Sequence, residues 1–169
     1  MLRKALHGLY LACGYAAAFF LAGIAVATLC QIVARQMGMA VETTEISGFF
    51  LAASTFLALA YTFVNGGHVR ITLIGQLFPQ GRNRWVELWC CAIGAFVTGY
   101  AAWQMTLFTA ESYRFGDLSP GMLGVPLWIP QSAVAFGLAV MCLGILEQAT
   151  LVWRGEEAGY ETNVDSTAE

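Results

Sequence analysis

Charged side chains are scarce in this chain of 169 residues, where they make up 11% of the sequence against 58% hydrophobic residues. Soluble domains carry about 25% charged residues, and a soluble fold with so few would expose large apolar patches. The composition therefore excludes an ordinary water-soluble domain and favours a membrane protein. With eight Lys and Arg in total and a net charge of −3, the chain also lacks a basic surface for nucleic acid.

Residues that commonly carry catalysis or redox chemistry are also few. The two histidines, His7 and His68, lie near the ends of apolar runs, whereas a haem-b bundle needs axial histidines inside its helices. The five cysteines form no Cys-x-x-Cys pair and lie within apolar stretches, as small buried hydrophobic residues do. The sequence has no nucleophile-elbow or Walker motif and no metal-ligand spacing. We therefore expect no enzyme activity and no bound metal or cofactor.

Long uncharged runs are the main feature that is present. Four of them are long enough to cross a bilayer core, which takes about 20 helical residues. They cover about residues 9–34, 46–64, 88–110 and 127–146. The sequence therefore predicts an all-α membrane protein whose four transmembrane helices lie within residues 1–153. Residues 154–169 are acidic and polar, which predicts a disordered tail.

An alternative for the first run is a cleaved signal peptide. Arg3 and Lys4 precede it, and Ala25-Val26-Ala27 has the pattern of a cleavage site. However, the apolar residues continue to Val33, well beyond the 7–15 residues typical of a signal-peptide core. The length favours a retained transmembrane helix.

The distribution of basic residues predicts the orientation of the chain. Four spans place both termini on the same side of the membrane, together with the connection between the second and third spans. Six of the eight basic residues fall on that side: Arg3, Lys4, Arg70, Arg82, Arg84 and Arg154. Because cytoplasmic segments carry the excess of Lys and Arg, both termini are expected in the cytoplasm.

The candidates for function are interface residues. Glu45 opens the second run, where the helix dipole stabilises a carboxylate and a cation on another helix or subunit is the alternative partner. Trp85 and Trp128 begin the third and fourth runs, at the depth of the aromatic belts. Pro130 lies in the first turn of the fourth run, where proline is tolerated.

The connection after the second run has an unusual pattern. From Ile71 onward, apolar residues recur at i, i+3, i+6 and i+7 until Pro79. This spacing suits a short amphipathic helix over residues 68–79 that lies in the plane of the interface, and a solvated basic loop is the alternative. His68 and Arg70 at its start are candidates for contact with lipid headgroups or with a partner subunit.

Helix packing in lipid relies on small residues and on polar side chains, because lipid gives helices no hydrophobic reason to associate. Small residues recur every four positions in each run: Gly14, Ala18 and Ala22; Gly48 and Ala52; Ala95 and Gly99; Ala133 and Gly137. These stripes are candidates for helix contacts. Gln31 and Gln104 are expected to hydrogen-bond between helices, and Glu147 to reach the membrane interface.

Two motifs occur in order along the chain. Glu45 stands before a run rich in Phe, Leu and Ala, which is followed by Gly67-His68-Val69-Arg70-Ile71. Later, Gly116-Asp117-Leu118-Ser119 is followed by Val125-Pro126-Leu127-Trp128-Ile129-Pro130. In this order the motifs resemble the small membrane subunit (DctQ type) of tripartite ATP-independent periplasmic (TRAP) transporters. The resemblance covers about residues 3–153.

The resemblance implies a noncatalytic subunit that scaffolds a large permease subunit (DctM type) in a bacterial inner membrane. In such systems the large subunit carries the substrate and sodium sites, and a periplasmic binding protein (DctP type) captures a small organic acid. The residues agree, since no span contains a midplane charge or an interruption. The alternatives are a self-sufficient small transporter, which would depend on the peripheral Glu45 and Glu147, and a membrane redox subunit.

Overall fold

The computed structural model describes residues 2–39, 42–64, 83–121 and 123–154. Its helices are α1 (Leu2–Gln36), α2 (Thr44–Val64), α4 (Asn83–Phe115) and α5 (Trp128–Arg154). Each contains a stretch that is long and apolar enough to cross a membrane, which confirms the prediction of an all-α fold with four spanning helices. The expected in-plane helix over 68–79 and the expected tail lie outside the described residues.

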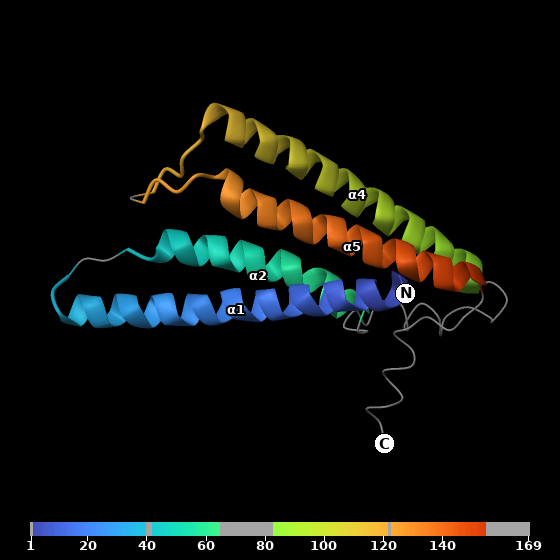
Figure 1. Cartoon of the computed structure of the whole chain (residues 1–169), viewed down its shortest axis with the longest axis horizontal. Helices are drawn as coiled ribbons and strands as arrows, with labels where there is room; N and C mark the ends of the chain where they lie inside the picture. Colours follow the sequence, from blue (N-terminus) through green and yellow to red (C-terminus); the bar gives the residue numbers. More distant parts are fainter. Residues whose placement is uncertain (1, 40–41, 65–82, 122, 155–169) are drawn as a thin grey trace, which may run out of the picture.

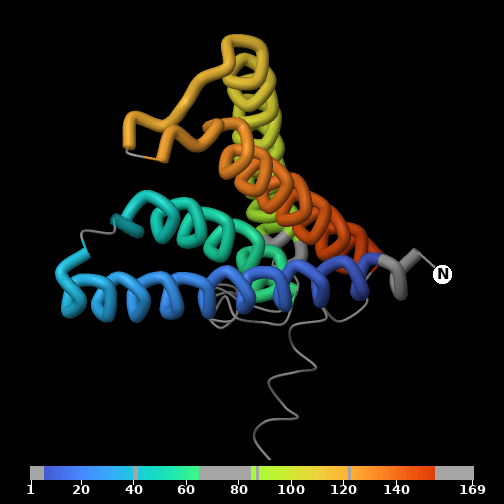
Figure 2. Tube along the Cα trace, turned by 60° about the vertical axis from the view of Figure 1, so that its left-hand side comes forward, coloured from blue at the N-terminus to red at the C-terminus, as the bar shows by residue number. Residues whose placement is uncertain are grey.

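The four helices lie side by side in one layer, in the order α1, α2, α5, α4 (Figure 1). Helix α2 packs against α1 on one side and α5 on the other, and α4 packs against α5. Helices α1 and α4 therefore form the two edges of the layer. Figure 2 shows that the helix axes turn progressively from α1 to α4, so the layer is twisted.

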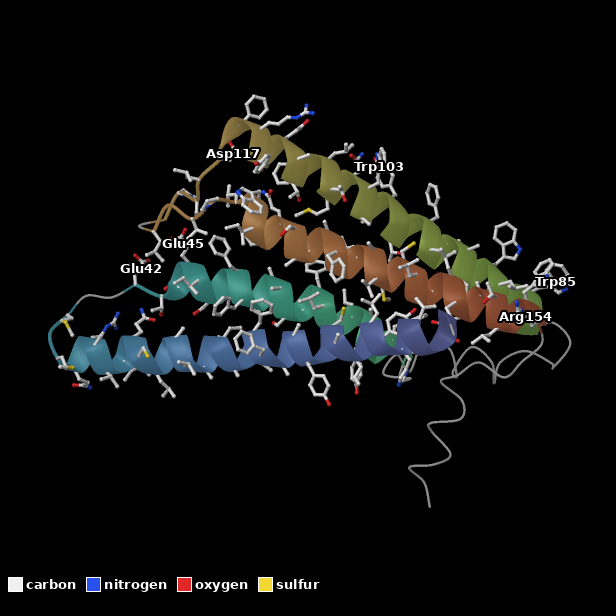
Figure 3. The ribbon with its side chains drawn as sticks, in the orientation of Figure 1. Glu42, Glu45, Trp85, Trp103, Asp117 and Arg154 are labelled. Atoms are coloured by element: carbon white, nitrogen blue, oxygen red, sulfur yellow. The ribbon has the colours of Figure 1, made fainter. Side chains whose placement is uncertain are left out.

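The two ends of the layer carry different residues. At one end, called here the terminal end, α1 and α4 begin and α2 and α5 finish, and Trp85 and Arg154 lie there in Figure 3. Glu42, Glu45 and Asp117 lie at the opposite end, called the Glu45 end. The first and last described residues thus share one end, as an even number of spans requires.

The best-packed region is the contact of α2 with α1 and α5. Its buried cluster consists of Tyr10, Cys13, Ala17, Leu57, Ala60 and Val140. Ala60 is completely inaccessible, which shows how closely α2 is enclosed by its two neighbours. Because lipid is as apolar as leucine, these close contacts between helices hold the layer together.

Several glycines face neighbouring helices. Gly14 of α1 lies against the ring of Tyr61 in α2, and Gly99 of α4 lies against the sulfur of Cys142 in α5. These contacts agree with the small-residue stripes expected at both positions. No other residue approaches the Cβ position of Gly48 within 4 Å, so the contact expected there is not formed within the described ranges.

Gly137 of α5 makes the closest backbone approach. A methyl group added at this position would lie 2.5 Å from the carbonyl oxygen of Phe56 in α2 and 2.6 Å from its carbonyl carbon. A side chain of any size at position 137 would therefore push against the backbone of α2. The glycine sets the distance at which α2 and α5 cross.

Candidate functional site

Glu45 links the start of α2 to the connection between α4 and α5. Its Oε2 accepts a hydrogen bond from the backbone N–H of Leu123 at 3.3 Å. The carboxylate also lies directly against Gly121, where any side chain would overlap it. Figure 3 shows Glu45 beside this connection at the Glu45 end of the layer. Since Glu45 is in the first turn of α2, the helix dipole also favours its negative charge.

The connection between α4 and α5 has a defined shape, which holds Gly121 and the backbone N–H of Leu123 beside Glu45. Leu118 and Pro126 form an isolated antiparallel bridge. The backbone N–H of Ser119 donates to the carbonyl of Val125 at 2.9 Å. Gly116 and Gly124, two residues before Leu118 and Pro126, have φ values of +66° and +56°, in the left-handed region that favours glycine. The second sequence motif therefore encodes a closed turn that holds residues 121 and 123 against α2.

The second carboxylate oxygen of Glu45 has a different environment. Oε1 is buried and has no hydrogen-bond partner among the described residues, and no cation from those residues pairs with the carboxylate. A buried acceptor without a donor is unfavourable, so this oxygen has unused capacity for a further donor. The helix-dipole interpretation fits the described structure, and pairing with a cation of another subunit stays a prediction.

The Gly121→Ala substitution should displace the Glu45 carboxylate and break its hydrogen bond to Leu123. Because the Glu45 side chain is flexible and can move aside, we expect a loss of about 1 kcal/mol, the net worth of one hydrogen bond. Thermal unfolding in detergent measures this loss. In a Glu45→Ala background, Gly121→Ala should have almost no further effect, whereas additive losses would show that the two residues do not interact.

The other residues selected from the sequence do not gather at Glu45. Trp85 is exposed at the terminal end of the layer. Trp128 is exposed at the start of α5 and contacts Tyr113 edge-on, with ring centroids 5.6 Å apart. Pro130 is half-buried in the first turn of α5. His68 and Arg70 lie outside the described residues. A role for these residues in binding lipid or a partner stays a prediction.

A hydrogen bond between α1 and α5 was not predicted from the sequence. The hydroxyl of Tyr10 donates to Oε2 of Glu147 at 2.8 Å, and Tyr10 is one of the largest fully buried side chains. Glu147 thus holds two helices together as well as lying near one end of a span. In the four-span topology, Tyr10 and Glu147 both lie toward the terminal end. Their similar depth in the membrane is the sequence feature that could have predicted this contact.

The two glutamines within the spans behave differently from each other. Thr43, just before α2, donates to Oε1 of Gln31 in α1 at 2.8 Å. Gln31 therefore bonds to the connection between α1 and α2, whereas a bond to another helix was predicted. Gln104 instead donates to the hydroxyl of Tyr100, one turn earlier in the same helix, at 2.8 Å. The prediction of an interhelical bond for Gln104 is therefore wrong within the described structure. The Gln104 side chain lies on the exposed side of α4, away from the other described helices.

No disulfide joins the five cysteines, all of which lie within the described ranges. Cys13 and Cys91 are buried, as expected of small hydrophobic residues, whereas Cys30 and Cys90 are exposed on the outside of the layer. Across the described ranges, no three His, Cys, Asp or Glu residues lie close enough together to hold a metal ion.

These observations define the protein as a multi-pass membrane protein whose described polar contacts join its own helices and loops. The family of tripartite ATP-independent periplasmic transporters, DctQ component, matches residues 24–155. The chain therefore belongs to the DctQ family, the small subunit of TRAP transporters, as its two motifs predicted. No curated protein and no solved structure matched the chain.

Proposed function

We propose that this protein is a noncatalytic scaffold that binds the large DctM-type subunit of its transporter. The main support is the distribution of charge in the spans. The described acidic and basic residues lie toward helix ends, as Arg35, Glu45, Glu111 and Glu147 do. A transport site typically has ionisable groups near the midplane and is built from broken helices, whereas each of the four helices is continuous.

The open shape of the layer supports the same role. A single layer has two faces and two edges, and large hydrophobic side chains are exposed on both edge helices, such as Phe19 on α1 and Phe96 on α4. Lipid or another membrane protein must cover this surface. In the proposed complex, the layer widens the static part of the transporter. The large subunit holds the substrate and sodium sites, and this subunit needs no cofactor.

The proposed setting is a bacterial inner membrane with both termini in the cytoplasm. Six of the eight basic residues belong to the terminal side of the four-span topology, which supports this orientation. A DctP-type binding protein then delivers a small organic acid from the periplasmic side, where the Glu45 end of the layer lies.

Co-purification tests the proposed role. When the chain is expressed with the large subunit and only the chain carries an affinity tag, we expect both proteins in a stoichiometric complex that survives detergent. Recovery of the tagged chain without the large subunit would contradict the proposal. Substrate uptake by the purified chain alone in liposomes would replace it with a self-sufficient transporter.

A further inference from the structure

We infer that the outward face of α4 binds a polar side chain on a transmembrane helix of the large subunit. This face is formed by Phe96, Tyr100, Trp103, Gln104 and Leu107. The inference rests on the proposed function, because it names the surface through which the large subunit is held.

The outward face differs in composition from the packed face of α4. Phe96 is 75% exposed, Trp103 65% and Tyr100 59%. Figure 3 shows Trp103 directed away from the other helices. The small residues Gly94 and Gly99 point the other way, against Ile145 and Cys142 of α5. Helix α4 therefore uses small residues to pack within the layer and leaves Phe96, Tyr100 and Trp103 exposed.

The outward face lies near the middle of the membrane. The exposed residues Trp89 and Tyr113, toward the two ends of α4, stand where interfacial aromatic belts are found. Tyr100 is about 17 Å from Trp89 and about 20 Å from Tyr113 along the helix, at 1.5 Å per residue. Tyr100, Trp103 and Gln104 are thus placed where hydrocarbon, and not water or headgroups, surrounds an isolated subunit.

These three residues retain unused hydrogen-bonding groups. The amide of Gln104 donates to the hydroxyl of Tyr100, and this is the only side-chain hydrogen bond that either residue makes within the described ranges. Oε1 of Gln104, the Tyr100 hydroxyl proton and the Trp103 indole N–H have no partner among the same residues. Hydrocarbon offers no donor or acceptor to satisfy them.

Exposed threonine side chains in the spans do not have this problem. The hydroxyls of Thr55, Thr62 and Thr106 donate to carbonyl oxygens three or four residues earlier in their own helices. They are therefore compatible with lipid, whereas the Gln104 amide is not fully satisfied by its helix. A polar side chain on a neighbouring transmembrane helix completes the hydrogen bonds. In the proposed complex, that helix belongs to the large subunit.

The Gln104→Leu substitution tests whether position 104 faces a partner protein or lipid. Leucine suits lipid better than glutamine does, so a lipid-facing position would tolerate the change. At a partner interface, we expect association with the large subunit to be about threefold to thirtyfold weaker, as for one lost hydrogen bond within a membrane. Affinity purification of the co-expressed subunits measures the change.

Thr106→Val is the matched control. It removes a polar atom from an exposed residue of the same helix. Because that hydroxyl already bonds to the Ala102 carbonyl at 2.7 Å, recovery of the complex should be unchanged. Thermal unfolding of the isolated chain should be the same for both variants, because neither side chain bonds to another helix. Equal recovery with Gln104→Leu and with the wild type would overturn the inference.

A photo-crosslinking residue in place of Leu107, one turn further along the same face, identifies the neighbour directly. We expect an adduct with the large subunit. An adduct with a second copy of this chain, or none in a complex that otherwise co-purifies, would overturn the assignment of this surface and leave the scaffold role intact. If the wild-type chain fails to co-purify with the large subunit, the scaffold role and the inference both fail.

Discussion

Gly137→Ala is expected to be strongly destabilising although it adds a single methyl group. The methyl would lie 2.5 Å from the carbonyl oxygen of Phe56, so α2 and α5 must move apart. A side chain could rotate away from such a clash, but the backbone of α2 cannot. We expect a loss of about 3 kcal/mol, at the upper end of the usual range for overpacking. Thermal unfolding of the purified protein in detergent measures it.

Gly48→Ala is the control for this prediction. Gly48 lies in α2, and no described residue beyond its own turn of the helix comes within 4 Å of its Cβ position. Alanine there should stabilise the helix by about 0.5–1 kcal/mol, because glycine is the less favourable residue inside a helix. Similar unfolding temperatures for the two variants would contradict the close crossing of α2 and α5.

Tyr10→Ala is expected to cause the second large effect. Tyr10 is only 2% exposed and lies in the cluster where α1, α2 and α5 meet. Its removal leaves a cavity and takes away the hydroxyl that binds Glu147. For a buried aromatic residue replaced by alanine, the expected loss is about 3–5 kcal/mol. Thermal unfolding in detergent again provides the measurement.

Tyr10→Phe separates the two contributions to this loss of stability, which are the packing of the ring and the hydrogen bond of the hydroxyl. The substitution keeps the ring and removes only the hydrogen bond to Glu147, so the expected loss is about 1 kcal/mol. Tyr15→Ala, on the same helix at a position 71% exposed, should change stability by less than about 0.5 kcal/mol. If Tyr15→Ala were as damaging as Tyr10→Ala, the described packing of α1 would be incorrect.

The four helices were predictable because an uncharged run of sufficient length has few alternatives to a spanning helix. The second run, expected over 46–64, is the helix Thr44–Val64. The ends of the others differ more. The fourth run was expected to finish before Glu147, yet α5 continues to Arg154. A charge ends an apolar run without ending a helix, and in this case Tyr10 binds the charged group.

The contacts between distant residues were not predictable in the same way. Glu45 was recognised as a candidate, but its partners Gly121 and Leu123 depend on the folded shape of a connection far along the chain. Likewise, the approach of Gly137 to Phe56 depends on α5 lying next to α2, and hydropathy does not encode the order of helices. For Gln104, polarity predicted a hydrogen bond between helices, whereas the structure places the residue on the outer side of α4, where it bonds to Tyr100 of the same helix.

Helix α5 is the last of the four to leave the ribosome, yet it stands between α2 and α4 in the finished layer. Until it enters the bilayer, α4 lacks its principal neighbour and one side of α2 is uncovered. Assembly is therefore completed only when synthesis of the helices is complete. A nascent chain that stops short of α5 therefore contains the packed pair of α1 and α2 together with an α4 that lacks its principal neighbour.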